Sequence, residues 1–207
     1  MWTGTDDKIE ILWIRHGMTA ANKEHRYLGT TDEPLSTEGA RRLIDQWKTK
    51  EWLLGHVDKL CSSPMKRCLE TAQLLFEQGE KKQIRVIPQW CEMDFGQFEY
   101  KNYRELNGNP DYQAWIDSGG TIAFPGGESR AEFIKRSMEG FTFLQEQLKK
   151  EVEPVHRICC IVHGGTIMAV LSQLLGGDYY DYQLPNGGCY LVQWTKEAGW
   201  TIIERME

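Results

Sequence analysis

The sequence predicts an α/β protein, a three-layer α/β/α sandwich with a mostly parallel central sheet. Two short apolar runs carry this prediction, one from Ile9 to Ile14 and one from Arg157 to Val162. Both are rich in β-branched residues, as buried strands of parallel sheets are. Both also end abruptly in polar residues, Arg15-His16-Gly17 after the first and His163-Gly164-Gly165 after the second. Ligands of open α/β sheets bind at the carboxyl ends of such strands.

The remaining elements alternate between helix and strand. In chain order we expect a helix from Ser36, a strand from Val57 to Cys61, a helix opened by Ser63 and Pro64, a strand from Ile84 to Ile87, a helix from Ser129 towards Lys150, a helix after Gly165 through about Leu175, and strands from Tyr190 to Trp194 and from Trp200 to Glu204. Ser63 and Pro64 fit a helix N-cap followed by a first-turn proline. Ser129 and Glu132 have the spacing of a capping box. The last two strands would add an antiparallel edge to a sheet that is covered on both faces.

Residues 90–127 do not fit this alternation. The segment is rich in aromatic residues and glycine and is only weakly periodic, so we expect an excursion over the edge of the sheet that covers the substrate. Neither an internal repeat nor a linker interrupts the chain, and 207 residues suffice for one substantial core. We therefore expect a single domain spanning residues 1–207.

Charge and composition exclude several classes of function. With 30 acidic and 24 basic residues, the chain has a net charge of −6, which argues against general attraction to nucleic acid or to an anionic membrane. An anion-binding site must then be a local basic pocket. The run from Ile9 to Ile14 is too short to span a membrane or to act as a signal peptide.

Cysteine and histidine usage argues against a metal site or a disulfide framework. The six cysteines show no paired ligand spacing, and adjacent Cys159 and Cys160 would point to opposite sides of a strand. No metal-binding triad is visible, so we expect neither metal nor cofactor, and a reducing, cytoplasmic location. Surface or turn positions are expected for His25, His56 and His156, and a solvated loop for Lys81 and Lys82.

Arg15, His16 and Gly17 form the first cluster that could carry chemistry. A histidine beside a permanent cation at a strand end can act as a nucleophile towards a phosphate group, and Gly17 permits close approach of the backbone. Taken alone, these three residues are better explained by a histidine without a catalytic role, whose hydrogen bonds are satisfied within a turn. The segments that follow decide between the two interpretations.

Five segments in a fixed order carry a family resemblance: RHGMTAANKEHRYLGTTDEPLSTEG, SSPMKRCLETA, EMDFGQFE, GGES and IVHGGT. In order and content they resemble the histidine phosphatase superfamily, also called the phosphoglycerate mutase-like family, and most of all its α-ribazole phosphatase branch. The match runs from about Ile11 to about Thr166. The resemblance implies a phosphoglycerate mutase-like fold and a metal-independent phosphatase acting on a small-molecule phosphomonoester. The candidate substrate is α-ribazole 5′-phosphate of cobalamin synthesis.

The same resemblance makes His16 the phosphorylated nucleophile and places Arg15, Arg67 and His163 around the phosphoryl group. Phosphoryl transfer spreads negative charge over three equatorial oxygens, and two guanidiniums and an imidazolium could balance that charge without a metal. Considered alone, Arg67 would be a solvated surface arginine. Cys68 replaces the alanine usual in the family, a change that we expect to be tolerated.

The EMDFGQFE segment resembles the family segment that places a carboxylate over the leaving-group oxygen, which makes Glu92 the general acid. Neighbouring Trp90, Met93 and Phe95 could raise the pKa of Glu92 by excluding water and so keep it protonated near neutral pH. Asp94 in the same segment is the rival acid. An exposed glutamate without a catalytic role is the structural alternative.

The resemblance also assigns two residues to substrate binding, since Asn22 matches an asparagine that contacts phosphate and Gly29 matches a backbone contact. Helix geometry adds Gly164, because it begins a helix whose amino end would favour an anion. Each has a structural alternative. Asn22 could cap the local turn, Gly29 could serve only a positive φ angle, and Gly164 could belong to a tight strand-to-helix turn.

Two other functions share these motifs. A phosphoglycerate mutase would use the same catalytic residues but return the phosphoryl group to another hydroxyl. A catalytically silent phospholigand-binding protein would use the same fold, with loss of His16 or Glu92 as its signature. Met18 and Tyr100 depart from the residues usual in the family, which leaves the chemistry intact and the substrate open.

Overall fold

The computed structural model describes residues 8–76 and 83–207 of the chain. These residues form one six-stranded sheet in the order β3-β2-β4-β1-β5-β6. Its strands are β1 (Lys8–Arg15), β2 (Lys59–Ser62), β3 (Ile84–Val86), β4 (Arg157–Val162), β5 (Cys189–Thr195) and β6 (Gly199–Met206). The first four pair in parallel, while β5 pairs antiparallel with both β1 and β6. The predicted fold class and its antiparallel edge are confirmed. The loop predicted around Lys81 and Lys82 lies outside the described residues.

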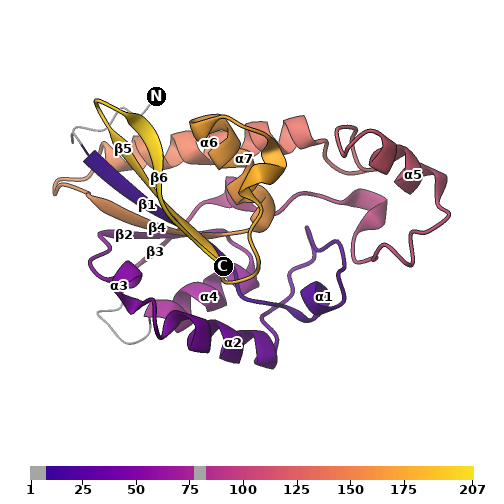
Figure 1. Cartoon of the computed structure of the whole chain (residues 1–207), viewed down its shortest axis with the longest axis horizontal. Helices are drawn as coiled ribbons and strands as arrows, with labels where there is room; N and C mark the ends of the chain where they lie inside the picture. Colours follow the sequence, from indigo (N-terminus) through magenta and orange to yellow (C-terminus); the bar gives the residue numbers. More distant parts are fainter. Residues whose placement is uncertain (1–7, 77–82) are drawn as a thin grey trace.

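Helices cover both faces of this sheet (Figure 1). They are α1 (Ala20–Lys23), α2 (Thr37–Trp47), α3 (Glu51–Leu54), α4 (Lys66–Phe76), α5 (Pro110–Asp117), α6 (Arg130–Leu148) and α7 (Gly164–Leu175), with 3₁₀ turns η1 (Pro88–Trp90), η2 (Gly96–Phe98) and η3 (Tyr179–Tyr182). In Figure 1, α6 and α7 lie on one side of the sheet and α2 and α4 on the other, which gives the three expected layers. In the part of the chain that the structure describes, no helix is both long and apolar enough to cross a lipid bilayer.

Alternating side chains along β1 build the two halves of the core. Ile11 and Trp13 belong to the cluster packed under α6 and α7, while Leu12 belongs to the cluster packed under α2 and α4, and all three are fully buried. Burial of each such side chain contributes roughly 1.5–3 kcal/mol to folding. β4 alternates in the same way, because Cys160 joins the first cluster and Cys159 the second. The two adjacent cysteines therefore point to opposite faces, as predicted.

The helix predicted to open at Ser63 begins later than expected. α4 starts at Lys66, whose N–H donates to Oδ1 of Asp32 at 2.7 Å. The hydroxyl of Ser63 instead lies 2.8 Å from Nε2 of His163. The same hydroxyl accepts the N–H of Met65 at 3.3 Å, but Ser63 lies three residues before α4, so the N-cap prediction is wrong. The buried ring nitrogen of His163 requires a hydrogen-bond partner, and Ser63 supplies it. By contrast, the capping box predicted at Ser129 is present at the start of α6.

The segment of residues 90–127 leaves the sheet after β3 and returns at α6. It extends past the carboxyl ends of the parallel strands, and its helix α5 lies at the far right of Figure 1. Phe98 and Phe124 are buried against Phe133 of α6 in a small separate core. Trp90 instead joins the main core and packs edge-on against Trp13. α5 has no counterpart in the sequence prediction, since none of its residues is buried and it lacks a clear apolar stripe.

Candidate active site

β1 and β4 deliver two histidines to one place. The strands are parallel neighbours with Arg15 opposite Val162, so the residues that follow them emerge side by side. The N–H of His16 donates to the carbonyl of Val162 at 2.9 Å. The rings of His16 and His163 are both buried, and their centroids lie 5.2 Å apart.

The imidazole of His16 is held in a defined tautomer. Its Nδ1 lies 2.7 Å from the carbonyl oxygen of Gly17, which can only accept, so Nδ1 carries the proton and Nε2 the free lone pair. Burial and the nearby charges of Arg67 and Arg15 lower the pKa of His16 well below 6.5. The ring is therefore neutral at neutral pH, and its Nε2 is available as a nucleophile.

Thr71 of α4 fixes the loop that follows β1. The N–H of Gly17 donates to the Thr71 hydroxyl at 2.9 Å, and that hydroxyl donates to the carbonyl of Arg67 at 2.7 Å. Thr71 thus connects α4, which carries Arg67, to Gly17, whose carbonyl accepts the hydrogen bond from the His16 ring. No sequence pattern gave Thr71 a role. Its spacing of four residues from Arg67 was the available signal.

Arg67 is fully buried, so its interpretation as a solvated surface arginine is wrong. Its guanidinium donates to the carbonyls of Thr31 and Gly29 at 2.9 and 3.0 Å. Its Nε donates to Nδ1 of His163 at 3.3 Å. Its Nη2 also donates to the carbonyl of Leu28 at 3.5 Å. None of these partners is charged, so the positive charge of Arg67 remains available to an anion.

Arg15 lies beside the amino end of α7. Its Nη1 donates to the carbonyl of Leu184 at 2.5 Å, whereas its buried Nε–H has no hydrogen-bond partner among the described residues. Burial lowers the pKa of Arg15, Glu92 opposes this effect, and the charge of Arg67 adds to it. Gly164 leaves room for the guanidinium, since a Cβ there would lie 3.2 Å from Nε of Arg15. An anion between the two arginines would satisfy the unpaired donor and reduce their repulsion.

Hydrogen bonds fix the tautomer of His163 in the unliganded site. Its Nδ1 accepts the Nε–H of Arg67, so the ring proton resides on Nε2, 2.8 Å from the Ser63 hydroxyl. Burial, and then the charge of Arg67, lower the pKa of His163 well below 6.5. In the unliganded site this shift favours the neutral ring, whereas the imidazolium expected around a bound phosphoryl group stays a prediction. Ser63, interpreted from sequence as a helix cap, is the residue that completes this tautomer.

Glu92 is half-buried in the loop after η1. Its Oε1 accepts the N–H of Met93 at 2.9 Å, and its Oε2 accepts the N–H of Gly165 at 3.4 Å. Burial raises the pKa of Glu92, while the Met93 N–H and the charges of Arg67 and Arg15 act in the opposite direction. The carboxyl group thus keeps its proton to higher pH than an exposed glutamate does, which suits a general acid.

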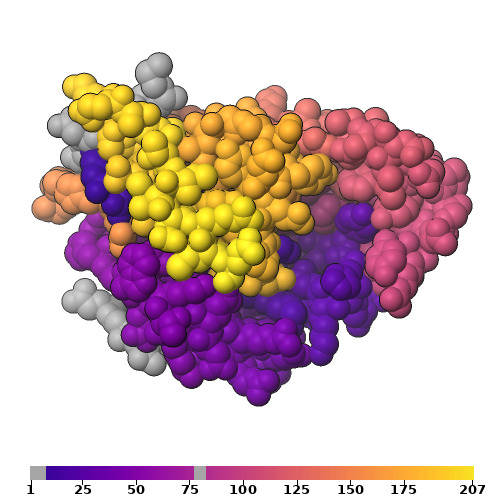
Figure 2. Space-filling view, viewed as in Figure 1, coloured from indigo at the N-terminus to yellow at the C-terminus, as the bar shows by residue number. Residues whose placement is uncertain are grey.

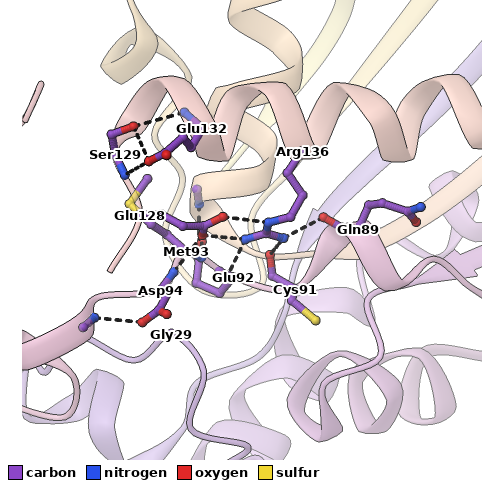
Figure 3. Close-up of polar contacts among 12 residues, drawn as sticks. Gly29, Gln89, Cys91, Glu92, Met93, Asp94, Glu128, Ser129, Glu132 and Arg136 are labelled. Atoms are coloured by element: carbon purple, nitrogen blue, oxygen red, sulfur yellow. Dashed lines mark hydrogen bonds and ion pairs between the residues drawn. The ribbon is translucent and has the colours of Figure 1, made fainter. Parts of the chain in front are cut away.

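The rival acid Asp94 serves the local turn. Its Oδ1 accepts the N–H of Gly96 at 2.8 Å, and its own N–H donates to Glu128 at 2.9 Å. Figure 3 shows Asp94 and Glu92 close together along the same loop. Glu92 lines the adjoining cavity and Asp94 does not. The geometry therefore favours Glu92 as the acid.

Asn22 both caps a helix and faces the cavity. It closes a capping box with Thr19 at the start of α1, and its Oδ1 accepts a hydrogen bond from Asn186 at 3.0 Å. The Asn186 amide also donates to the carbonyl of His16 at 3.2 Å. Asn186 therefore links Asn22 to the nucleophile, and both asparagines line the cavity. No sequence pattern singled out Asn186, which precedes β5.

Gly29 is not among the residues that line the cavity. Its N–H donates to Oε1 of Glu99 at 2.9 Å, and its carbonyl accepts from Arg67. Its φ angle is not positive, so that structural alternative is wrong. A Cβ at this position would lie 2.0 Å from the carbonyl oxygen of Met93. Glycine is needed here for the close approach of two loops, and Gly29 contacts the site through Arg67.

Arg15, Glu92, Asn22 and Asn186 border a cavity of about 720 Å³. Basic and aromatic side chains line it: Arg15, Lys23, Arg26, Arg42 and Arg130, and Tyr27, Phe95, Trp115, Phe124, Tyr179 and Tyr180. Glu92 supplies the one carboxyl group of this lining within the described residues. Figure 2 shows the hollow between α7 and the 90–127 segment, with the chain that follows β1 at its floor. His16, Arg67 and His163 lie behind the lining.

The other histidines lie in exposed or turn positions, and the cysteines are unpaired. His56 and His156 are exposed, whereas His25 occupies a left-handed turn with φ of 54° and also lines the cavity. All six cysteines are free. Across the described ranges, no three His, Cys, Asp or Glu side chains are grouped so that they could hold a metal ion.

Known proteins resemble this chain in sequence and in structure. The profile of the histidine phosphatase superfamily (branch 1) matches residues 11–205. An adenosylcobalamin/alpha-ribazole phosphatase from Salmonella typhimurium is 29% identical over 169 residues, which cover 79% of each chain. The alpha-ribazole phosphatase of Shigella flexneri superposes with a TM-score of 0.81 at 22% identity over 96% of both chains. A phosphoglycerate mutase from Thermus thermophilus superposes with a TM-score of 0.68 at 27% identity, over 96% of this chain and 99% of the mutase. These superpositions confirm the phosphoglycerate mutase-like fold.

Proposed function

Because this chain belongs to the histidine phosphatase superfamily, we propose that it hydrolyses a small-molecule phosphomonoester through a phosphohistidine at His16, without a metal ion. One observation carries the proposal. The hydrogen bond from Nδ1 of His16 to Gly17 leaves Nε2 unprotonated beside the guanidiniums of Arg15 and Arg67. A neutral nucleophile next to fixed positive charge is what attack on a phosphate dianion requires.

In the first half-reaction, Nε2 of His16 attacks phosphorus in line with the leaving oxygen. The N–P bond forms as the P–O bond breaks, and Glu92 gives its proton to the departing alkoxide. Arg15 and Arg67 hold the equatorial oxygens, where charge accumulates. His163 orients Arg67 by accepting its Nε–H at Nδ1. Burial and the charge of Arg67 lower the pKa of His163 in the unliganded site, and the charge of a bound phosphoryl group would act in the opposite direction.

In the second half-reaction, the ionised Glu92 removes a proton from water as the water oxygen attacks phosphorus. The N–P bond breaks, inorganic phosphate leaves, and Glu92 is protonated again for the next turnover. The same two arginines hold the phosphoryl oxygens. Asn22 and Gly164 line the cavity, and we assign both to binding of the phosphoryl group. Gly29 would contribute through its carbonyl bond to Arg67.

For the substrate, we propose a flat, partly apolar leaving group, as in α-ribazole 5′-phosphate of cobalamin synthesis. Aromatic faces around the cavity favour such a group over a small charged acid. Phe95, Trp115 and Phe124 of that wall come from the 90–127 segment, which would cover the substrate. The similarity to the adenosylcobalamin/alpha-ribazole phosphatase from S. typhimurium supports this choice. We also place the enzyme in a reducing cytoplasm, with its six cysteines unpaired.

The substrate proposal is tested by side-by-side kinetics with product identification. We expect α-ribazole 5′-phosphate, or another phosphomonoester with an aromatic leaving group, to exceed 3-phosphoglycerate in kcat/KM. Inorganic phosphate should be the main product. A preference for 3-phosphoglycerate, with net isomerisation to 2-phosphoglycerate, would contradict the proposal.

A phosphoglycerate mutase is the second candidate, favoured by the likeness to the T. thermophilus mutase. It would use the same residues but keep the phosphohistidine until another hydroxyl accepts the phosphoryl group. The product measurement separates the two functions. A silent phospholigand-binding protein is disfavoured, because an unprotonated Nε2 at His16 and a raised pKa at Glu92 have no use in binding alone.

A further inference from the structure

Arg136 of α6 reaches into the loop that carries Glu92 (Figure 3). A guanidinium has five N–H donors, and Arg136 uses all five. Its Nε and Nη2 bind the carboxylate of Glu128 at 2.8 and 2.7 Å. Its Nη1 donates to the carbonyls of Gln89 and Cys91 at 2.8 and 2.9 Å. Its Nη2 also donates to the carbonyl of Glu92 itself at 3.2 Å.

Glu128 extends this network to the far side of Glu92. Its Oε2 accepts the N–H of Asp94, and its own N–H donates to the carbonyl of Asp94, both at 2.9 Å. One ion pair therefore ties residues on both sides of Glu92 to α6. Neither Arg136 nor Glu128 lines the cavity. The pair can therefore reach the reaction through the loop or through the charge of Arg136, which also acts on His163, and Arg136→Lys keeps that charge.

We propose that Arg136, oriented by Glu128, is the positioning residue that sets where Glu92 presents its proton. Arg136 holds the backbone of Glu92, and the N–H groups of Met93 and Gly165 then direct the carboxylate. A misplacement of about 1 Å in a catalytic group can cost roughly 10²-fold in rate. Lysine cannot replace this arginine, because it has three donors and lacks the planar fork.

The inference rests on the proposed role of Glu92 as general acid, so its test compares two leaving groups. R136K and E92Q are assayed for kcat/KM with an alkyl phosphate, whose leaving oxygen needs a proton, and with p-nitrophenyl phosphate, whose leaving group departs without one. We expect R136K to lose about 10- to 100-fold on the alkyl ester. The loss on the nitrophenyl ester should be far smaller. A merely structural role would lower both values equally.

Arg157 offers a matched control. It forms a half-buried ion pair with Glu10 at 2.6 Å, at the opposite ends of β4 and β1 from the site. R157K should leave the ratio of the two kcat/KM values unchanged. If R136K does not yield folded protein, E128Q, which keeps the side-chain volume and weakens the hold on Arg136, should produce the same selective loss.

A double mutant separates action through Glu92 from an independent effect. Residues that act as a unit are not additive, so adding R136K to E92Q should cause little further loss on the alkyl ester. Full additivity, or equal losses on both esters in R136K, would overturn the role of Arg136 alone. If E92Q itself shows no dependence on the leaving group, the general-acid assignment fails, and the role of Arg136 fails with it.

Discussion

The charge state of a few buried side chains decides what this site can do. Removal from water favours the neutral form of every titratable group, which is the unprotonated form of a histidine and the protonated form of a glutamate. One environment therefore lowers the pKa of His16 and of His163 and raises that of Glu92. Both shifts favour the forms that the reaction uses, a neutral imidazole at His16 and a protonated carboxyl group at Glu92.

A pH prediction follows from the direction of the Glu92 shift. Glu92 must be protonated to act as an acid, and burial raises its pKa above 4.5. For an alkyl phosphate, kcat/KM should therefore stay high through that value and fall as pH rises above the raised pKa. The low pKa of His16 means that its protonation causes no loss near pH 6.5. Rate profiles of the wild type and Glu92→Gln, measured on the same ester, check this. Retention of the same alkaline decline in the variant would assign it to another group.

The order of the motifs located the residues that the fold brings together: Arg15, His16, Arg67, Glu92 and His163. It could not supply the protonation states of these side chains. The tautomer of His163 depends on hydrogen bonds to Ser63 and Arg67, which lie 100 and 96 positions away. Its lowered pKa depends on burial and on the charge of Arg67. Such contacts leave no local pattern. The roles of Asn186 and Arg136 could not be predicted for the same reason, because their hydrogen-bond partners lie on distant segments of the chain.

At the level of elements, the amino end of α7 organises the acid. Gly164 makes room for Arg15, and the N–H of Gly165 reaches the carboxylate of Glu92. A Cβ at position 165 would lie 2.3 Å from Oε1 of Glu92 and 3.0 Å from the ring of Phe133. The second glycine is therefore required by the position of the acid, and no positive φ angle is involved.

Gly165→Ala should accordingly displace the Glu92 carboxylate while leaving α7 intact. We expect a loss on the order of 10²-fold in kcat/KM for an alkyl phosphate, since alanine itself favours a helix. Gln173→Ala, at an exposed position of the same helix, is the control and should behave like the wild type. Steady-state kinetics and far-UV circular dichroism together measure this. Full activity in Gly165→Ala would mean that the carboxylate need not occupy this position.

Elements were predicted well where burial imposes a pattern and poorly where it does not. β4 has the predicted bounds, and β1 differs from its prediction by one residue at each end, because both are buried on two faces and read as unbroken apolar runs. α5 has no buried residue, so its sequence carries no such run. The start of α4 was misplaced because Ser63-Pro64 has the same appearance whether the serine caps a helix or binds a distant histidine.

For the whole molecule, net charge and local charge have opposite signs. The chain carries −6 overall, yet five arginine and lysine side chains and one carboxyl group line the described cavity. A small anion is therefore attracted to the cavity, whereas the rest of the surface gives no general attraction to polyanions. This arrangement suits a soluble phosphate ester as the substrate.

Insensitivity to chelation is expected from the same distribution of charge. Arg15 and Arg67 are assigned the neutralisation of the phosphoryl group, so removal of divalent cations should leave turnover unchanged. The measurement is kcat before and after dialysis against EDTA, with added Mg²⁺, Mn²⁺ and Zn²⁺ as controls. A large loss that one of these metals restores would contradict the assignment.

The most direct test of the central claim is detection of phosphate on His16. Enzyme and a radiolabelled phosphomonoester are mixed, quenched in alkali during turnover, and mapped by mass spectrometry of the peptides. We predict an acid-labile, alkali-stable label on the peptide that contains His16, formed at least as fast as product, with both label and turnover absent in His16→Ala. Turnover without any label, or a label on another residue with activity retained in His16→Ala, would contradict a phosphohistidine mechanism at this site.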